Sequence, residues 1–475
     1  MPVDILQSIF SDIWSAIIAL LFFGASIFVH ELGHFLAARW RGLHIERFSI
    51  GFGPAIWSWR GKDGVEYRLS WLPLGGYVTL PQLAAMSEIE GESSVDVSKL
   101  PPVSYGSRML VLVAGATCNV LFALALACII WITGQPSNSM ATSTTIGYVA
   151  PELALPDGRK VTSPAKEAGL QAGDVILAID GNKVGEWNEI VQTIVTGSGR
   201  TATGEPKTVF TIERNGVVKD ITVYPQLAGP DEFRTAGIDA GYELIVRGVT
   251  ADSVADQAGF QNGDQIVSFN GQPILNITTY FEILARHKAE PVNATVRRGE
   301  SEIALSIPAR PDSKDAQIGL ALTTGFSLTH PTPFQQLTDN VLMTVRTLAS
   351  LINPQSDIGL SKMSGPVGIV RILHSAAQAD LTILIMFTIL INVNLAIFNL
   401  LPIPVLDGGQ MLFATIAKLR GRALPTNFIM ATQSTFMLLL FGMMIYVTVF
   451  GDIRRLFRDI QSEKPAATAP ADAGE

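Results

Sequence analysis

Residues 28–39 read FVHELGHFLAAR and end an apolar run that spans residues 13–38. The run exceeds the roughly 20 apolar residues that a helix needs to cross a bilayer. No basic segment precedes it and it has no small-residue cleavage site, so the run is predicted to be a retained membrane helix rather than a signal peptide. We therefore expect His30, Glu31 and His34 inside a membrane-spanning helix. Burial of an ionisable side chain in the bilayer costs free energy, so such residues usually have a function.

Similar apolar runs occur at three more places, residues 109–132, 381–401 and 428–450. The chain of 475 residues is 48% hydrophobic and only 16% charged, with a mean hydropathy of +0.33, which is too apolar for an ordinary soluble protein of this size. The predicted fold class is a multi-pass α-helical membrane protein with about four transmembrane helices. A net charge of −8 leaves no broad basic surface, so nucleic acid is not expected as a partner.

A region of globular composition separates the second run from the third and contains an internal repeat. SPAKEAGLQAGDVILAIDGNKV, from Ser163, matches SVADQAGFQNGDQIVSFNGQPI, from Ser253, at a constant offset of 90 positions. Such a register predicts two copies of one small β-rich domain. The shared pattern resembles PDZ domains, which bind extended peptides, often carboxyl termini, by strand addition. Two roles stay open for the copies, the binding of peptide tails and the exclusion of bulky proteins.

The first apolar run contains the pattern His-Glu-x-x-His. Residues four apart lie on one face of a helix, so His30 and His34 can both reach a single Zn²⁺ at about 2.0–2.1 Å. Glu31 lies beside the first histidine and can take a proton from a water that the metal activates. The structural alternative is that Glu31 pairs with a nearby arginine and that the imidazoles are satisfied by hydrogen bonds.

A catalytic zinc usually has three protein ligands, so a third one is expected. His44 follows the basic end of the first helix and is better interpreted as an interfacial histidine. The third apolar run ends in NLLPIPVLDGG, residues 399–409, where two prolines interrupt the helix before Asp407. Broken helices at membrane depth are tolerated only where they line a cavity, and an aspartate there requires a cation. Asp407 is the predicted third ligand.

Several motifs together resemble the site-2 protease family of intramembrane zinc metalloproteases, in particular its bacterial regulator-of-sigma-E protease branch. They are HELGH, LPLGGYV at residues 72–78, the paired PDZ-like insert, SGPVGI from Ser364 and NLLPIPVLDGG, in this order along nearly the whole chain. The resemblance implies a zinc endopeptidase with one Zn²⁺ per chain, held by His30, His34 and Asp407, with Glu31 as the general base.

Other residues are candidates for contacts with the substrate. Asn399 precedes Asp407 by eight positions. It is predicted to donate a hydrogen bond to the developing oxyanion or to hold the substrate backbone, and the alternative is that it caps a broken helix end. Two alternating apolar runs around Asp63-Gly64 predict a β-hairpin at the membrane face that can accept an unwound substrate by strand addition. Gly75, Gly76 and Tyr77 in this region are the candidate substrate-binding residues, and a purely structural hairpin is the alternative.

Two positions depart from the resembled family. Gln410 stands where near relatives often carry histidine after LDGG, and Ala116 stands where the pattern AGPxxN has proline, whereas Asn119 of that pattern is present. Neither departure affects a predicted ligand.

Basic residues indicate the orientation of the chain, because cytoplasmic loops are enriched in Lys and Arg. The segments after the first run and before the fourth run carry Arg39, Arg41, Arg47, Lys418, Arg420 and Arg422. This places the metal site toward the cytoplasm and the PDZ-like copies outside it, although Arg454, Arg455 and Arg458 after the fourth run favour the opposite side. The resemblance implies a bacterial inner-membrane protein whose partners are single-pass membrane proteins, such as pre-cut anti-sigma factors or remnant signal peptides.

Two other functions stay open at this point. One is a membrane PDZ scaffold with a vestigial metal site, and the other is a metal transporter. Glu31 separates them from a protease, because neither of them requires an acid between two histidines. The predicted segments are 1–40 (first transmembrane helix), 41–107 (cytoplasmic loop with hairpin), 108–134 (second helix), 141–230 and 231–310 (PDZ-like copies), 330–380 (amphipathic outer helices), 381–420 (third transmembrane segment), 427–451 (fourth helix) and 452–475 (tail, end disordered).

Overall fold

The computed structural model describes residues 3–83, 99–229, 231–310 and 317–462. The chain forms two compact units. The first, which we call the helical unit, comprises Met1–Gln135, His330–Val345 and Leu360–Glu475. The second, the β-rich unit, comprises Pro136–Thr329 and Arg346–Gly359.

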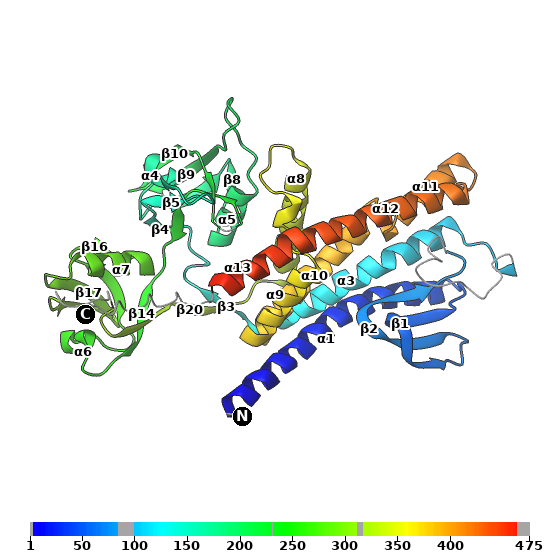
Figure 1. The fold of residues 1–475 in the computed structure, drawn as a ribbon, viewed down its shortest axis with the longest axis horizontal. Coiled ribbons are helices and arrows are strands. Elements are labelled where there is room, and N and C mark those ends of the chain that lie inside the picture. The colour runs from blue at the N-terminus through cyan, green and yellow to red at the C-terminus, as the bar shows by residue number, and fades with distance from the viewer. Residues whose placement is uncertain (1–2, 84–98, 230, 311–316, 463–475) are drawn as a thin grey trace, which may run out of the picture. The chain divides into compact units, whose positions relative to one another are not determined.

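Four helices of the described chain are long and apolar enough to cross a membrane. Three of them lie in α1 (Val3–Trp40), α3 (Tyr105–Thr133) and α10 (Leu381–Asn399), and the fourth begins with α12 (Thr426–Val447) and continues to Arg458 (Figure 1). A π-helical turn, η3 (Thr448–Ile453), joins α12 to α13 (Arg454–Ser462). The predicted fold class, four apolar helices with inserted β-rich segments, is therefore confirmed.

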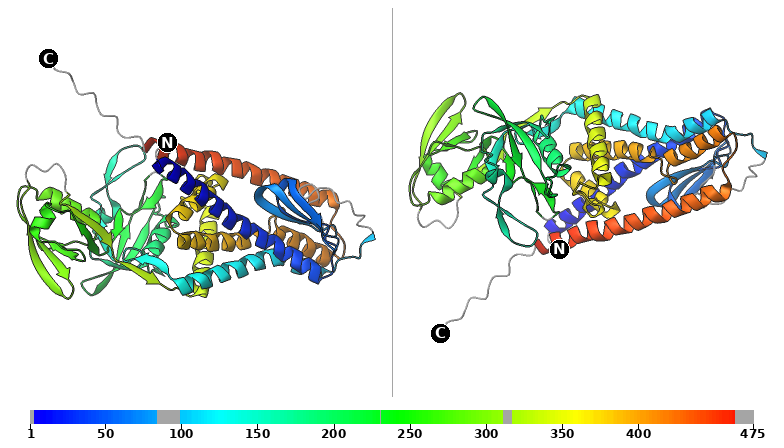
Figure 2. Two further views of the ribbon diagram at one scale, coloured as in Figure 1. Left: turned by 90° about the horizontal axis from the view of Figure 1, so that it is seen from below. Right: turned by 90° about the horizontal axis from the view of Figure 1, so that it is seen from above.

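The helices α1 and α3 approach each other closely at a glycine. A Cβ atom built at Gly33 would lie 2.8 Å from the carbonyl carbon of Ala114 on α3, so only glycine permits this separation, as is common between membrane helices. Figure 2 shows α1 and α3 in two further views. The helix α3 also packs on α10 through a buried cluster that comprises Ala123, Leu126, Ala127, Ile130, Ile385, Ile389 and Val393. These contacts hold α1, α3 and α10 in one group.

A small twisted sheet packs against α1. Its strands are β1 (Arg47–Arg60) and β2 (Glu66–Thr79), joined across the Asp63-Gly64 turn that the sequence indicates. Residues 47–50 pair with residues 66–69 and also with residues 76–79, so the end of β2 lies at an edge of the sheet. The ring of Phe48 contacts Phe35 of α1 at 5.2 Å between centroids. This packing brings the end of β2 against α1.

The helical structure is interrupted between the end of α10 and the start of the next helix, α11 (Asp407–Arg420). Lys418 and Arg420, which lie between the third and the fourth apolar runs of the sequence, are in the last turn of α11. Cations are stabilised there by the negative end of the helix dipole, which explains why these residues extend the helix. Two further helices precede α10, namely α8 (Pro333–Ile352) and α9 (Pro366–Ala379). The short helix η2 (Leu360–Lys362) lies between these two.

The β-rich unit contains two similar sheets. The first has the order β10-β9-β7-β8, and the second has the order β18-β17-β15-β14-β19. Their strands are β7 (Val175–Ile179), β8 (Asn182–Lys183), β9 (Thr208–Arg214), β10 (Val217–Val223), β14 (Leu244–Val249), β15 (Gln265–Phe269), β17 (Val292–Arg298), β18 (Ser301–Ile307) and β19 (Leu320–Thr324). The short helices are α4 (Pro164–Glu167), α5 (Trp187–Val195), α6 (Val254–Ala258) and α7 (Ile277–Arg286).

Shorter strands complete the β-rich unit. They are β3 (Gln135–Asn138), β4 (Ile146–Val149), β5 (Glu152–Ala154), β6 (Lys160–Thr162), β11 (Gln226–Ala228), β12 (Phe233–Thr235), β13 (Ile238–Ala240), β16 (Gln272–Pro273) and β20 (Phe326–Thr329).

The repeated residues make the same contacts in both sheets. Arg214 donates to both carboxylate oxygens of Asp174 at 2.5 and 2.6 Å, and to the carbonyl of Gly169 at 2.8 Å. Arg298 and Asp264 repeat this pair at 2.6 and 2.8 Å. Through its arginine, each repeated aspartate thus connects the turn at the end of a helix to the end of a strand. This shared contact explains why the Gly-Asp pairs recur in the sequence.

Candidate metal centre

Three ligand-type side chains converge in the helical unit. The Nε2 atoms of His30 and His34 lie 3.1 Å apart, and each lies 3.3 Å from Oδ2 of Asp407. Their ligand atoms lie within 4.8 Å of one another. Tetrahedral ligands at zinc bond lengths of about 2.0–2.1 Å would be separated by about 3.3 Å, so the three atoms fit the ion.

The donor set also has the right chemistry. The Oδ2 atom of Asp407 is buried and has no hydrogen-bond partner among the described residues. Two imidazole nitrogens and one carboxylate oxygen are typical zinc ligands. By contrast, His44 is exposed and lies outside this cluster. The predicted metal-ligand residues therefore come together in the structure.

Asp407 reaches the histidines because the chain folds back tightly after α10. A Cβ atom at Gly408 would lie 2.5 Å from the carbonyl carbon of Leu400, and one at Gly409 would lie 2.6 Å from the Cα atom of Pro404. Both positions thus require glycine. The carboxylate is the first residue of α11, where the positive end of the helix dipole favours a negative charge.

The helix α3 forms another wall of the site. A Cβ atom at Gly115 would lie 2.8 Å from Nε2 of His30, and the same position also faces His34. The backbone carbonyl of Val111 accepts a hydrogen bond from Nδ1 of His34 at 2.8 Å. This bond requires the proton on Nδ1 and leaves Nε2 of His34 with a free lone pair toward Asp407. The sequence analysis assigned no role to Val111 or Gly115. The signal that could have indicated Gly115 is its place in the pattern AGPxxN of the resembled family.

Glu31 lies next to the end of β2. A Cβ atom at Gly76 would come within 3.1 Å of its Cγ atom, and the backbone of Val78 hydrogen-bonds to its carboxyl group. The side chain of Tyr77 instead bonds to Arg47. Of the candidate substrate-binding residues, Gly76 is thus the one that the structure places against Glu31.

Asn399 ends α10 at the border of the metal cluster. Its Nδ2 atom lies 3.5 Å from Nε2 of His30, so its amide group lies beside one of the predicted ligands. An amide in this position can donate to an oxygen that is held beside the metal.

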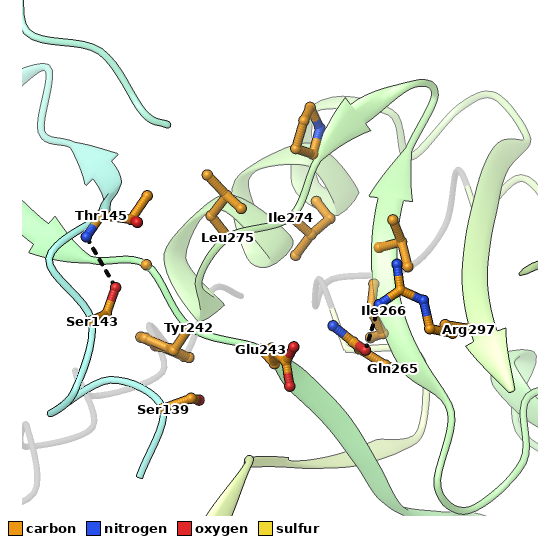
Figure 3. A pocket seen from close by; sticks show the side chains of 13 residues that line it. Ser139, Ser143, Thr145, Tyr242, Glu243, Gln265, Ile266, Ile274, Leu275 and Arg297 are labelled. Carbon is orange, nitrogen blue, oxygen red and sulfur yellow. Dashed lines mark hydrogen bonds between the residues drawn. The ribbon is translucent and has the colours of Figure 1, made fainter. Parts of the chain in front are cut away.

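The β-rich unit contains a separate pocket of about 480 Å³. Figure 3 shows Ser139, Ser143 and Thr145 on one side of it and Gln265 and Arg297 on the other. Arg297 donates to Gln265 at 3.4 Å. The residues that line this pocket include no His or Cys, so it offers a surface for polar contacts rather than a second metal centre.

Comparison with known proteins identifies the family. Residues 18–443 match peptidase family M50. The chain is 30% identical to the regulator of sigma-E protease RseP of Escherichia coli K12 over 475 residues, which covers 94% of this chain and 99% of that protein. It is also 30% identical to the regulator of sigma E protease of Salmonella typhi, over 94% of this chain and all of the relative.

A third relative is described as a putative zinc metalloprotease, from Vibrio cholerae, with 28% identity over 94% of this chain and 99% of the relative. The zinc cofactor and the metalloprotease activity predicted from the sequence are thereby confirmed. The four apolar helices and these relatives support a location in the inner membrane. The chain therefore belongs to peptidase family M50 and is an intramembrane zinc metalloprotease of the site-2 type.

Proposed function

We propose that this protein cleaves single-pass membrane proteins within their transmembrane segments, with His30, His34 and Asp407 as the zinc ligands. The observation that carries the proposal is the convergence of these three side chains, with ligand atoms 3.1–3.3 Å apart, directly beside Glu31. Neither a scaffold nor a transporter requires an acid at this position, whereas hydrolysis requires a general base there.

Each residue then has a defined task in hydrolysis. Zinc, when bound, polarises the scissile carbonyl and acidifies the attacking water. Glu31 takes the proton of that water and later gives it to the leaving amine. The amide of Asn399 donates a hydrogen bond to the carbonyl oxygen as negative charge develops on it.

The edge of β2 is the proposed docking strand for the substrate. A transmembrane helix has all its backbone groups hydrogen-bonded, so it must unwind before its peptide bond is attacked. Residues 76–79 pair with residues 47–50 on one side, and no other described strand pairs with them. Gly75 and Gly76 have no side chain, which leaves the backbone there accessible. An extended substrate can therefore add beside this edge and present its carbonyl next to Glu31.

The proposed natural substrates follow from the relatives, which are named regulators of sigma E. Pre-cut anti-sigma factors and remnant signal peptides are the candidate classes. In the orientation predicted by the basic residues, the active site lies toward the cytoplasm and the β-rich unit lies outside. Cleavage then falls in the inner half of the bilayer.

The two sheets of the β-rich unit are proposed to be PDZ-like copies that control access. The matched Asp–Arg pairs of the two copies support their common origin. Arg297 lines the pocket of about 480 Å³ and also pairs with Glu302 at 3.4 Å, and its guanidinium is the group that would bind the carboxylate of a peptide tail. The alternative role of the copies is to exclude proteins with bulky outer domains.

The test compares Glu31→Gln with His34→Ala in cells that produce a truncated single-span substrate. Glu31→Gln should keep its zinc but let the substrate accumulate in the membrane, because only the base is lost. His34→Ala should lose both zinc and activity. Clearance of the substrate by Glu31→Gln at the normal rate would show that the mechanism is wrong and would favour the scaffold.

A further inference from the structure

Three residues of α3 line up along the metal site. Val111, Gly115 and Asn119 are spaced by four, so they lie on one face of the helix. The first accepts the hydrogen bond from Nδ1 of His34, and the second faces the ring of His30. The role of the third, Asn119, is not explained by the zinc ligands or the base.

Asn119 is fully buried, with 0% of its surface exposed. Neither Oδ1 nor Nδ2 of its amide has a hydrogen-bond partner among the described residues. Buried amides are almost always paired. The Nδ1 atom of His30 is also buried without a described partner. Two complementary groups, an amide acceptor on α3 and a ring N–H on α1, are thus both buried and unpaired among the described residues.

The packing of α1 on α3 brings these groups to the same level. The two helices run in opposite directions, since His34 meets Val111 and His30 meets Gly115, one turn further along α3. Side chains of a helix lean toward its N-terminus, so the amide of Asn119 leans back toward the level of Gly115. The Cβ position of Gly115 is 2.7 Å from Cε1 and 2.8 Å from Nε2 of His30, and Cε1 is the ring carbon that joins Nε2 to Nδ1.

We propose that Asn119 is the positioning residue for His30. Through one bridging water, its Oδ1 atom accepts the hydrogen bond of Nδ1–H of His30, and this contact keeps Nε2 of the ring deprotonated and directed at the metal. Metal-binding histidines generally need such a partner on their second nitrogen. Along α3, the Val111 carbonyl then serves one histidine and the Asn119 amide serves the other. This inference rests on the ligand set of the proposed function.

The test is the zinc affinity of purified full-length protein in detergent, measured by competition with a chelator. Asn119→Leu keeps the approximate size of the side chain but removes the acceptor, and we expect zinc affinity to fall about 10–100-fold. Asn119→Asp keeps an acceptor oxygen and should remain near the wild-type affinity. The visible spectrum of the Co²⁺-substituted protein should change in Asn119→Leu and not in Asn119→Asp, because the ligand ring reorients only in the former.

Asn276→Leu is the matched control. Asn276 is also buried, but it lies in the β-rich unit, where its Oδ1 accepts a hydrogen bond from the backbone N–H of Thr279. It should lose stability without losing zinc affinity. An equal loss of zinc affinity in both leucine variants would overturn the proposal, because removal of any buried polar side chain would then lower the zinc affinity.

Wild-type zinc affinity in Asn119→Leu would also overturn it. If that variant does not fold, the smaller Asn119→Val provides the same comparison. His34→Ala separates this inference from the ligand set on which it rests. If His34→Ala loses zinc while Asn119→Leu does not, only the role of Asn119 is wrong. If His34→Ala retains zinc, the ligand set itself is wrong.

Discussion

The Nε2 atom of His34 lies 3.3 Å from Oδ2 of Asp407, although one residue belongs to the first apolar helix and the other follows the third. This relationship closes the metal site. It depends on the break after α10, which lets α11 begin beside the histidines rather than continue away from them.

Asp407→Asn should lose most of the bound zinc. The substitution preserves the shape of the side chain but removes the negative charge. Loss of a residue that supports a metal ligand typically lowers metal affinity by roughly 10–100-fold, so loss of a ligand itself should lower it further. We expect zinc affinity to drop by more than about 100-fold, as measured by metal analysis after dialysis against a chelator. Gln410→Asn, one turn into the same helix, is the control and should retain zinc. Stoichiometric zinc in Asp407→Asn would remove Asp407 from the ligand set.

Gly115→Ala should damage the site through its single added methyl group. That methyl would lie 2.8 Å from Nε2 of His30, closer than non-bonded atoms can approach, so a histidine or α3 must move. Overpacking of this kind costs about 1–3 kcal/mol, and we expect lower zinc affinity and lower activity. Gly106→Ala is a matched control on the same helix, because its Cβ position has no atom within 4 Å. Equal activity of the two variants would contradict the close approach of α3.

Gly76→Val should lower activity while leaving zinc content unchanged. A side chain there would contact the Cγ atom of Glu31 and the carbonyl oxygen of Ser49, at 3.1 and 2.9 Å from its Cβ. It would displace Glu31 and also obstruct the edge of β2. We expect at least a tenfold loss in turnover of a single-span substrate, equivalent to about 1.4 kcal/mol in the barrier. Normal turnover with normal zinc would mean that this edge does not contact the substrate.

The β-rich unit should lose stability in acid through Asp357. Burial alone would raise the pKa of this carboxyl group, but hydrogen bonds from Arg234 and Arg200 outweigh burial and hold the pKa below its ordinary value. The ion pair therefore stabilises the fold above the unfolded-state pKa of about 3.9 and is lost as pH falls through the lower folded-state pKa. Hydrogen exchange of residues 199–235 should accelerate in that window.

Asp357→Asn should remove this pH dependence. It should also destabilise the unit at neutral pH by about 3 kcal/mol, because the side chain of Arg234 is 0% exposed and would lose its counter-charge. Asp157→Asn is the control. Its partner Arg159 is 74% exposed, and exposed pairs contribute less than about 1 kcal/mol. If both variants exchange equally fast, the Asp357 pair does not stabilise the unit.

The sequence predicted the parts of the site that depend on local periodicity. His30 and His34 are one helical turn apart, so any helix through them brings both rings to one side. Asp407 could be predicted because a carboxylate between prolines and glycines in an apolar run has few structural explanations. The four apolar helices follow from the same simple requirement, since length and hydropathy decide which segments can cross a membrane.

The α3 wall could not be predicted in this way. Val111 and Gly115 contact the histidines of α1, and no spacing along the chain records these contacts. Likewise, Gly76 was one of three candidates, and only the packing of β2 on α1 separated it from Tyr77, whose side chain bonds to Arg47. These contacts depend on how close two helices or a helix and a strand approach.

The sequence alone thus determined which segments enter the membrane, where the sheets repeat and which residue types can bind zinc, because these properties depend on composition and local spacing. Only the tertiary structure decided that Asp407 meets His30 and His34, and that the Val111 carbonyl of α3 accepts the second hydrogen bond of His34. The reason is physical: these relationships are set by distances of a few ångströms between elements far apart in the chain, and those distances depend on glycine contacts such as Gly33 against Ala114.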